Sequence, residues 1–187
     1  MPRSTDTRKK MVTSAALLLR QDGVAGTGFR DVVAHSGTPR GSIGHHFPGG
    51  KRELVSEAVR WAGGLSSKAM RTKAETPEEI VALIFGLYRR ALFDTEFAAG
   101  CPVGAVAQEA YSDPELRAAV QAVFDDWREV LRESLTRAGH ADEHAFELAD
   151  MAIASMQGAI MLSRVDGNTD ALDRVERQLL KLVTPGE

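Results

Sequence analysis

Apolar residues recur every three to four positions along almost the whole chain, which is the spacing of one face of an α-helix. The sequence lacks the apolar–polar alternation between turn signals that is typical of strands. This pattern predicts an all-α protein with nine helices. The expected helices lie at about 5–23, 29–35, 38–47, 51–71, 76–97, 103–110, 114–138, 142–165 and 170–183.

Short polar residues mark the expected starts of several helices. Thr27 is expected to cap the second helix. Thr38 is expected to cap the third, with Pro39 in its first turn, where a proline loses no hydrogen bond. Thr76, followed by a proline and two glutamates, predicts the start of the fifth helix. Gly23 is the expected stop of the first helix.

The charge is distributed unevenly along the 187 residues. Residues 1–52 hold nine Lys and Arg against three Asp, a balance of +6, so the total of −3 leaves −9 for the remainder. A basic head on an acidic body indicates that the head meets a polyanion. A solvated basic tail would give the same balance if the head carried no motif.

Cys101 is the only cysteine in the chain, so no internal disulfide can form. This fits a reducing cytoplasm, and a cytoplasmic protein is expected. We see no apolar stretch after the N-terminal residues that is long enough for a signal peptide. We also see none that approaches a transmembrane span, so no membrane association is expected.

Residues 36–54 carry the most specific motif. Two short helices joined by a tight turn at 36–38 match the helix-turn-helix that places its second helix in the DNA major groove. Small residues in that second helix allow close approach to base edges, and Arg40 can reach phosphate or guanine. Lys51 begins the next helix, where its charge can clamp the DNA backbone. Arg3, Arg8 and the two lysines after Arg8 are expected to form a flexible arm along the DNA.

The candidate DNA-binding residues combine small, cationic and hydroxyl side chains. They are Thr27, Thr38, Pro39, Arg40, Gly41, Ser42, Gly44, His45, His46 and Lys51. His45 and His46 also suggest a metal site. However, adjacent histidines point about 100° apart on a helix, and no Cys, Asp or Glu cluster lies nearby in the sequence. No metal, cofactor or catalytic residue is expected.

The segment resembles the TetR family of bacterial repressors, whose third helix commonly reads close to Gly-Val-Ser-Lys-Gly-Thr-Leu-Tyr-His-His-Phe. The Pro-Arg-Gly-Ser stretch, the extra glycine in Pro-Gly-Gly-Lys and the Gly-Cys-Pro at 100–102 resemble its LmrA-like branch. The resemblance implies that His45 and His46 contact phosphate or are structural. Where the family usually has a tyrosine that contacts the DNA backbone, this chain has Gly44.

The resemblance further implies an effector pocket enclosed by the fourth to seventh helices. Aromatic and methionine side chains line adaptable apolar cavities. The candidate ligand-binding residues are Trp61, Phe85, Tyr88, Phe93, Gln108, Phe124, Trp127, Met151 and Met156, with Gln157 and Arg89 as further polar anchors. Most of these residues would equally suit an ordinary core.

The resemblance implies a homodimer through the last two helices, which form a four-helix bundle with their partners. The apolar and small residues there are Ala145, Leu148, Ala149, Ala152, Ser155, Ala159, Leu162, Leu172, Val175, Leu179 and Val183. The same residues would suit an intrachain core. The expected domains are a DNA-binding head at 1–52, completed by the start of the fourth helix to about 65, and an effector and dimerisation domain at 53–187.

Three alternatives remain at this point. The helix-turn-helix corner can serve packing alone, or the chain can be a helical small-molecule-binding protein with a degenerate DNA-binding head, which Gly44 makes conceivable. It can also be an enzyme, although the glycine motifs at 26–28 and 44–49 lack required neighbours. The favoured interpretation is a non-enzymatic, ligand-responsive transcriptional regulator. We expect a repressor that binds a palindromic DNA operator as a homodimer and is released by an unknown small molecule.

Overall fold

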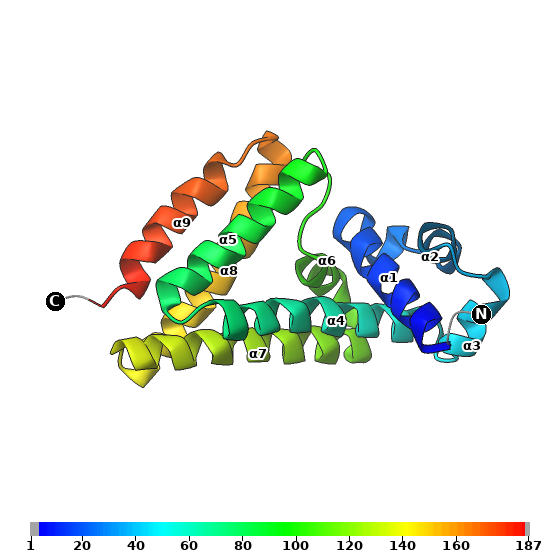
Figure 1. Ribbon diagram of the computed structural model, residues 1–187, viewed down its shortest axis with the longest axis horizontal. Helices are drawn as coiled ribbons and strands as arrows, with labels where there is room; N and C mark the ends of the chain where they lie inside the picture. Colours follow the sequence, from blue (N-terminus) through cyan, green and yellow to red (C-terminus); the bar gives the residue numbers. More distant parts are fainter. Residues whose placement is uncertain (1–3, 186–187) are drawn as a thin grey trace. The chain divides into compact units, whose positions relative to one another are not determined.

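A computed structural model describes residues 4–185, and within them the chain forms nine α-helices, two 3-10 turns and no strand. The all-α prediction is therefore confirmed (Figure 1). The elements are α1 (Ser4–Gly26), α2 (Phe29–Ser36), η1 (Arg40–Ser42), α3 (Ile43–His46), α4 (Gly50–Lys73), α5 (Pro77–Asp94), α6 (Pro102–Glu109), η2 (Ala110–Ser112), α7 (Pro114–Ala138), α8 (Asp142–Asp166) and α9 (Asp170–Val183).

The chain divides into two compact units, and neither is continuous in sequence. The first unit contains the chain up to Gly64 together with Pro102–Val123. The second contains Leu65–Cys101 together with the chain from Phe124 onward. Long helices α4 and α7 therefore each contribute residues to both units. The sequence did not indicate that α6 and the start of α7 belong with the N-terminal helices.

The core of the first unit lies where α1 packs against α2 and α6. Met11 and Leu19 of α1 and Val106 of α6 are fully buried, and Val103 of α6 is 1% exposed. Gly23 takes a left-handed conformation (φ 67°) and kinks α1 there, which agrees with the expected stop. A side chain at Gly23 would also collide with Glu109, because a Cβ would lie 2.6 Å from Oε1.

Glu109, the last residue of α6, holds the corner that follows this kink. Its carboxylate accepts hydrogen bonds from the backbone N–H of Val24 at 2.7 Å and of Ala25 at 3.2 Å. These N–H groups have left the regular helical ladder at Gly23, so the carboxylate satisfies donors that would otherwise face solvent. The end of α6 thereby fixes the start of the connection to α2.

The second unit places α9 against α8 and α5 (Figure 1). Thr76 caps α5 as expected, since its hydroxyl accepts the N–H of Glu79 at 3.2 Å. Arg89 of α5 donates to Asp173 and Glu176 of α9, and these contacts join the two helices across the unit. Burial of the guanidinium lowers its pKa, but hydrogen bonds to Glu176 and then Asp173 outweigh that and leave the pKa of Arg89 raised.

Helix α8 corrects the expectation that nothing approaches a transmembrane span. It is the one helix in the described residues that is long and apolar enough to cross a membrane by length and composition. This is weak evidence, because the core helix of a soluble protein passes the same test. One face of α8 is indeed packed inside the second unit, through residues such as Leu148, Ala152 and Ile160.

Candidate nucleic-acid interface and internal cavity

The turn and short helix that follow α2 present small and cationic residues to solvent. Helix α2 ends at Gly37, which is left-handed (φ 64°). The chain then forms η1 and the single turn of α3. Ile43 and Phe47 point inward and are 8% and 1% exposed, whereas Arg40, Gly41 and Gly44 lie on the surface. Two buried anchors thus fix a segment whose outer side is free for a ligand.

The Phe47 ring also contacts the side chain of Arg8. The Arg8 guanidinium carbon lies 4.7 Å from the centre of the Phe47 ring, within the range of a cation–π contact. Arg8 also donates to Glu53 at 2.9 Å and pairs with Glu57, both on α4. Arg8 is therefore a structural clamp within a helix, and the expected flexible arm is wrong for residues 8–10. Arg3, the remaining arm residue, lies outside the described residues.

Both expected caps in this region are wrong. Thr27 is buried, and its hydroxyl donates to the carbonyl of Gly23 at 2.8 Å. The N-cap of α2 is instead Gly28, whose N–H donates to Asp31 at 3.0 Å. Thr38 exchanges a hydrogen bond with Ser36 at 2.7 Å. The third helix is also shorter than expected, because Pro39 is extended and the following three residues form a 3-10 turn.

The remaining candidate residues of the head lie at or near the surface. His45 is exposed, and His46 and Lys51 are half-buried. Ser42 donates its hydroxyl back to the carbonyl of Pro39 at 2.6 Å. A Cβ added at Gly44 would meet no atom within 4 Å, so open space surrounds this position. No side chain therefore projects at this position, where the family usually has a tyrosine.

Charge on the head is largely unneutralised. Lys9, Lys10, Arg30, Arg40 and Lys51 take part in no ion pair within residues 4–185, whereas Arg8 and Arg52 do. Lys9 and Lys10 also line an open groove between α1 and α2, together with His35. Unpaired cations around an exposed short helix can contact the phosphates of a nucleic acid.

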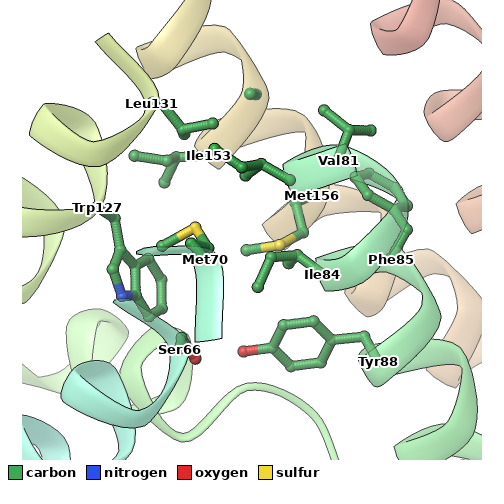
Figure 2. A pocket seen from close by; sticks show the side chains of 12 residues that line it. Ser66, Met70, Val81, Ile84, Phe85, Tyr88, Trp127, Leu131, Ile153 and Met156 are labelled. Carbon is green, nitrogen blue, oxygen red and sulfur yellow. The ribbon is translucent and has the colours of Figure 1, made fainter. Parts of the chain in front are cut away.

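The second unit encloses a small cavity between the end of α4 and the helices α5, α7 and α8. It has a volume of about 40 Å³. Its lining is almost entirely apolar: Ser66, Met70, Ile80, Val81, Ile84, Phe85, Tyr88, Trp127, Leu131, Ala152, Ile153 and Met156 (Figure 2). The volume is small beside the roughly 300–1,000 Å³ of ordinary ligand pockets, so a larger ligand requires side chains to move.

Four of the expected ligand-binding residues line this cavity: Phe85, Tyr88, Trp127 and Met156. The other five do not. Trp61 and Gln108 belong to the first unit, Phe93 and Met151 are 57% and 39% exposed, and Phe124 packs edge-on against Trp127 at 5.7 Å between ring centres. Of the expected anchors, Arg89 is engaged with α9 and Gln157 donates to the Cys101 sulfur at 3.4 Å.

The sequence interpretation missed most of the aliphatic wall of the cavity. The lining also contains Met70, Ile80, Ile84, Leu131 and Ile153, none of which is among the candidate ligand-binding residues. An apolar stripe has the same pattern whether it meets another side chain or an empty space, so spacing alone carries no signal that separates the two.

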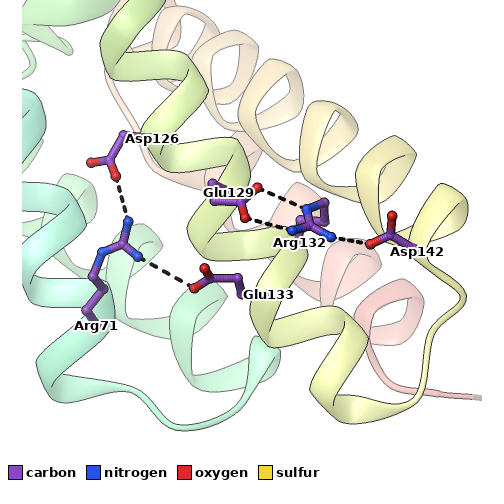
Figure 3. A network of polar contacts seen from close by, with 6 residues as sticks. All are labelled: Arg71, Asp126, Glu129, Arg132, Glu133 and Asp142. Carbon is purple, nitrogen blue, oxygen red and sulfur yellow. Dashed lines mark hydrogen bonds and ion pairs between the residues drawn. The ribbon is translucent and has the colours of Figure 1, made fainter.

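Charged residues on the helices around the cavity pair with one another. Arg71 of α4 binds Asp126 at 2.6 Å and Glu133 at 3.7 Å, both on α7 (Figure 3). Arg132 of α7 binds Glu129 at 2.7 Å and also contacts Asp142 of α8. The hydrogen bond from Arg132 lowers the pKa of Glu129, and the same pairing raises the pKa of Arg132.

Together these features define a helical regulator with a helix-turn-helix head, and comparison with known proteins agrees. Residues 12–58 match the model of the bacterial regulatory proteins of the tetR family. Residues 77–178 match the C-terminal domain of LmrA/YxaF-like transcriptional regulators. The chain belongs to the TetR family of DNA-binding transcriptional regulators, and its C-terminal region is of the LmrA/YxaF-like type.

Individual relatives support the same assignment along nearly the whole chain. The chain is 41% identical over 182 residues to an uncharacterized HTH-type transcriptional regulator of Mycobacterium tuberculosis, covering 94% of this chain and 93% of the relative. It is 32% identical over 172 residues to the HTH-type transcriptional regulator LmrA of Bacillus subtilis, covering 89% and 91%. A TetR transcriptional regulator from Legionella pneumophila shares the fold, with a TM-score of 0.81 at 21% identity over 91% and 93% of the chains.

Proposed function

We propose that this protein is a ligand-responsive repressor that binds a palindromic operator as a homodimer and is released by a small molecule. The observation that carries the proposal is the segment from Pro39 to His45, which is anchored by Ile43 and Phe47 and carries Arg40 and two glycines on its outer side. Small residues allow close approach to base edges, and arginine is suited to guanine or phosphate.

In this proposal the DNA contacts come from residues 1–52, completed by the start of α4 to about 65. Arg40 and His45 face the groove, and Lys51 clamps a phosphate at the beginning of α4. Lys9 and Lys10, which are exposed and outside every described ion pair, extend the contact along the backbone. Thr27 is left out, because its hydroxyl is buried and already donates to a carbonyl.

Dimerisation through α8 and α9 is supported by an exposed stripe on α8 that shares only Leu162 with the expected interface residues. Most of the small residues considered for the interface are buried within the chain; the exceptions are Ser155, Leu162 and Val175. The exposed stripe instead follows helical spacing and consists of Met151, Ala154, Met161, Leu162 and Val165, with the half-buried Gly158 among them. Apolar and small residues in one stripe suit close helix–helix packing.

A two-fold dimer gives the operator its symmetry, because it places two recognition helices about one DNA turn apart. The effector would occupy the cavity of the second unit. Helix α4 lines that cavity with Ser66 and Met70, while its first turns pack Leu54 and Val55 into the core of the first unit. Movement of α4 on ligand binding would therefore shift the DNA heads, and such coupling is typically about 1–3 kcal/mol. As a bacterial chromosome-binding protein it would act in the cytoplasm.

The experiment is a selection of genomic DNA fragments with the purified protein, repeated over a series of salt concentrations. We expect enrichment of one palindromic site, with affinity that falls steeply with salt. Lys51→Ala should then weaken binding on all sequences and reduce the salt slope by about 1. Lys73→Ala is the matched control, since Lys73 is an exposed lysine at the other end of the same helix.

Absence of sequence-selective binding at every salt concentration, from folded dimeric protein without effector, would contradict the proposal. A helical ligand-binding protein with a degenerate DNA-binding head would then be the better interpretation, and Gly44 would mark the lost contact. A monomer at micromolar concentration would contradict the dimer and its α8 interface independently of DNA.

A further inference from the structure

Within residues 4–185, the lining of the cavity in the second unit is aromatic and apolar and contains no acidic or basic residue. Among the described residues that line it, none carries an ionised side chain at neutral pH. Three aromatic rings, from Phe85, Tyr88 and Trp127, and the two thioethers of Met70 and Met156 contribute to the wall (Figure 2). An ionised group entering this space would lose its hydration and meet no opposite charge in the lining.

The arginines that follow Met70 and Trp127 in the sequence cannot supply that charge without breaking existing pairs. Arg71 is held by Asp126 at 2.6 Å, and Arg128 is held by Asp150 at 2.6 Å. Hydrogen bonding to Asp150 raises the pKa of Arg128 despite its partial burial. Because each guanidinium already has a carboxylate partner, recruiting it to an anionic ligand would leave that carboxylate unpaired.

The hydroxyl groups of the lining occur at one end of the cavity only. The hydroxyls of Ser66 and Tyr88 point toward each other there, whereas Leu131, Ile153 and Val81 form the other end (Figure 2). The Tyr88 hydroxyl also donates to the sulfur of Cys101 at 3.0 Å. A ligand is thus offered an apolar space with hydroxyls at a single end.

Met70 and Met156 make this space adjustable. Both side chains line the cavity (Figure 2) and are buried, at 4% and 6% exposed. Methionine has three rotatable side-chain bonds and repacks readily. Rotation of these two side chains can enlarge a space of about 40 Å³ without displacing a helix.

We infer that the cavity takes an uncharged, mainly apolar ligand of aromatic-ring size or larger, with one hydrogen-bonding group directed at Tyr88 and Ser66. This inference rests on the proposed function for its regulatory meaning, since the ligand would be the effector. It concerns only binding chemistry, so it can be tested without DNA.

The test uses four probes of similar size: 2-phenylethanol, ethylbenzene, phenylacetate and 2-phenylethylamine. Binding is followed by fluorescence of Trp127 in the Trp61→Phe protein, which leaves one indole in the chain. The two neutral probes should bind at least tenfold more tightly than the two ionised ones. Met156→Ala should strengthen neutral binding by opening room for the ring, as engineered apolar cavities admit benzene.

Tyr88→Phe provides the test of the polar end. Loss of the hydroxyl should weaken the affinity for 2-phenylethanol by about two- to tenfold, the usual net value of one hydrogen bond. The affinity for ethylbenzene should not change. Comparing two probes on the same variant cancels any structural effect of losing the Cys101 contact. Circular dichroism of each variant establishes that it is folded.

Equal binding of the ionised probes would overturn the inference, as would no saturable binding in either the wild-type or the Met156→Ala protein. A Tyr88→Phe effect that is the same for both neutral probes would overturn the assignment of the polar end. Neutral probes that bind without releasing operator DNA would count against the proposed ligand response and leave the ligand chemistry standing.

Discussion

The two units differ in the cations that surround their candidate binding sites. In the first unit Arg40 and the two lysines of α1 are exposed and Lys51 is half-buried. None of them takes part in an ion pair within the described residues. In the second unit Arg71, Arg128 and Arg132 are each bound by carboxylates around an uncharged cavity. Unpaired cations attract a polyanion, whereas mutually paired charges leave an interior suited to a neutral molecule. The unpaired cations of the first unit therefore suit DNA binding, and the paired charges of the second unit suit binding of a neutral ligand.

The largest expected effect comes from removing the anchor of the DNA-facing segment. Phe47→Ala should destabilise the first unit by about 3–5 kcal/mol, because the ring is almost fully buried and supports the Arg8 guanidinium. Chemical denaturation and DNA binding measure the loss. If the two binding sites are independent, the Phe47→Ala protein should lose DNA binding at a lower temperature than 2-phenylethanol binding. The ligand is followed in the Trp61→Phe background. Loss of DNA binding and ligand binding at the same temperature would contradict the independence of the two sites.

A pair of adjacent glycines in α4 gives the next effect. A Cβ at Gly63 would lie 2.3 Å from Val123, whereas Gly64 has open space around it. Gly63→Ala should therefore cost about 1–3 kcal/mol through overpacking. Gly64→Ala should stabilise by about 0.5–1 kcal/mol, since alanine is the better helix former. Thermal denaturation distinguishes them, and equal shifts for both variants would contradict the close approach of α4 and α7 in the first unit.

Gly44 tests the DNA-facing side directly. Gly44→Tyr should raise operator affinity by a few-fold, about 1 kcal/mol for a regained phosphate hydrogen bond, because nothing occupies the space around this position. Gly44→Ala is the control for helix propensity, and it should change stability more than affinity. Weaker binding by the tyrosine variant would indicate that the glycine approaches a base edge closely, which would sharpen the account of the interface.

The smallest effect concerns the paired charges of the second unit. The hydrogen bond from Arg132 lowers the pKa of Glu129, so this contact stabilises the fold above the carboxyl's unfolded pKa and is lost as pH falls through the folded pKa. Arg132→Gln should therefore lower the melting temperature slightly near pH 7, and the difference should shrink as pH falls through the folded pKa of Glu129. A difference that persists in acid would show that Arg132 acts through packing and not through charge.

Helix positions could be predicted because they depend on local spacing and local start signals. Eight of the nine expected helices both begin and end within a few residues of the observed ones, and Thr76 caps α5 as its neighbours indicated. The third helix was too long in the prediction, since Thr38 bonds Ser36 and Pro39 stays extended. In so short a segment the geometry is set by how Ile43 and Phe47 pack, which local propensity does not encode.

The cavity was only half predictable, because residue type does not reveal which way a helix faces. Phe85 and Trp127 line it, but Phe93 lies on the same helix as Phe85 and is 57% exposed. Met151 and Met156 likewise share α8 and differ in burial. Whether an aromatic or thioether side chain reaches the interior depends on the rotation of its helix against three others, and that is a property of the tertiary packing.

Glu109 has a consequence for how such a gene can recombine. Its carboxylate secures the corner after α1, and α6 supplies part of the core beneath that helix. A crossover that exchanged only the N-terminal 64 codons with a relative would pair a foreign α1 with the resident α6. Functional chimaeras therefore require two exchanges, one at each discontinuous segment, or a partner gene with a matching α6. Specificity for new operators is consequently expected to evolve through point changes on the surface of α3 and not by wholesale transfer of the head.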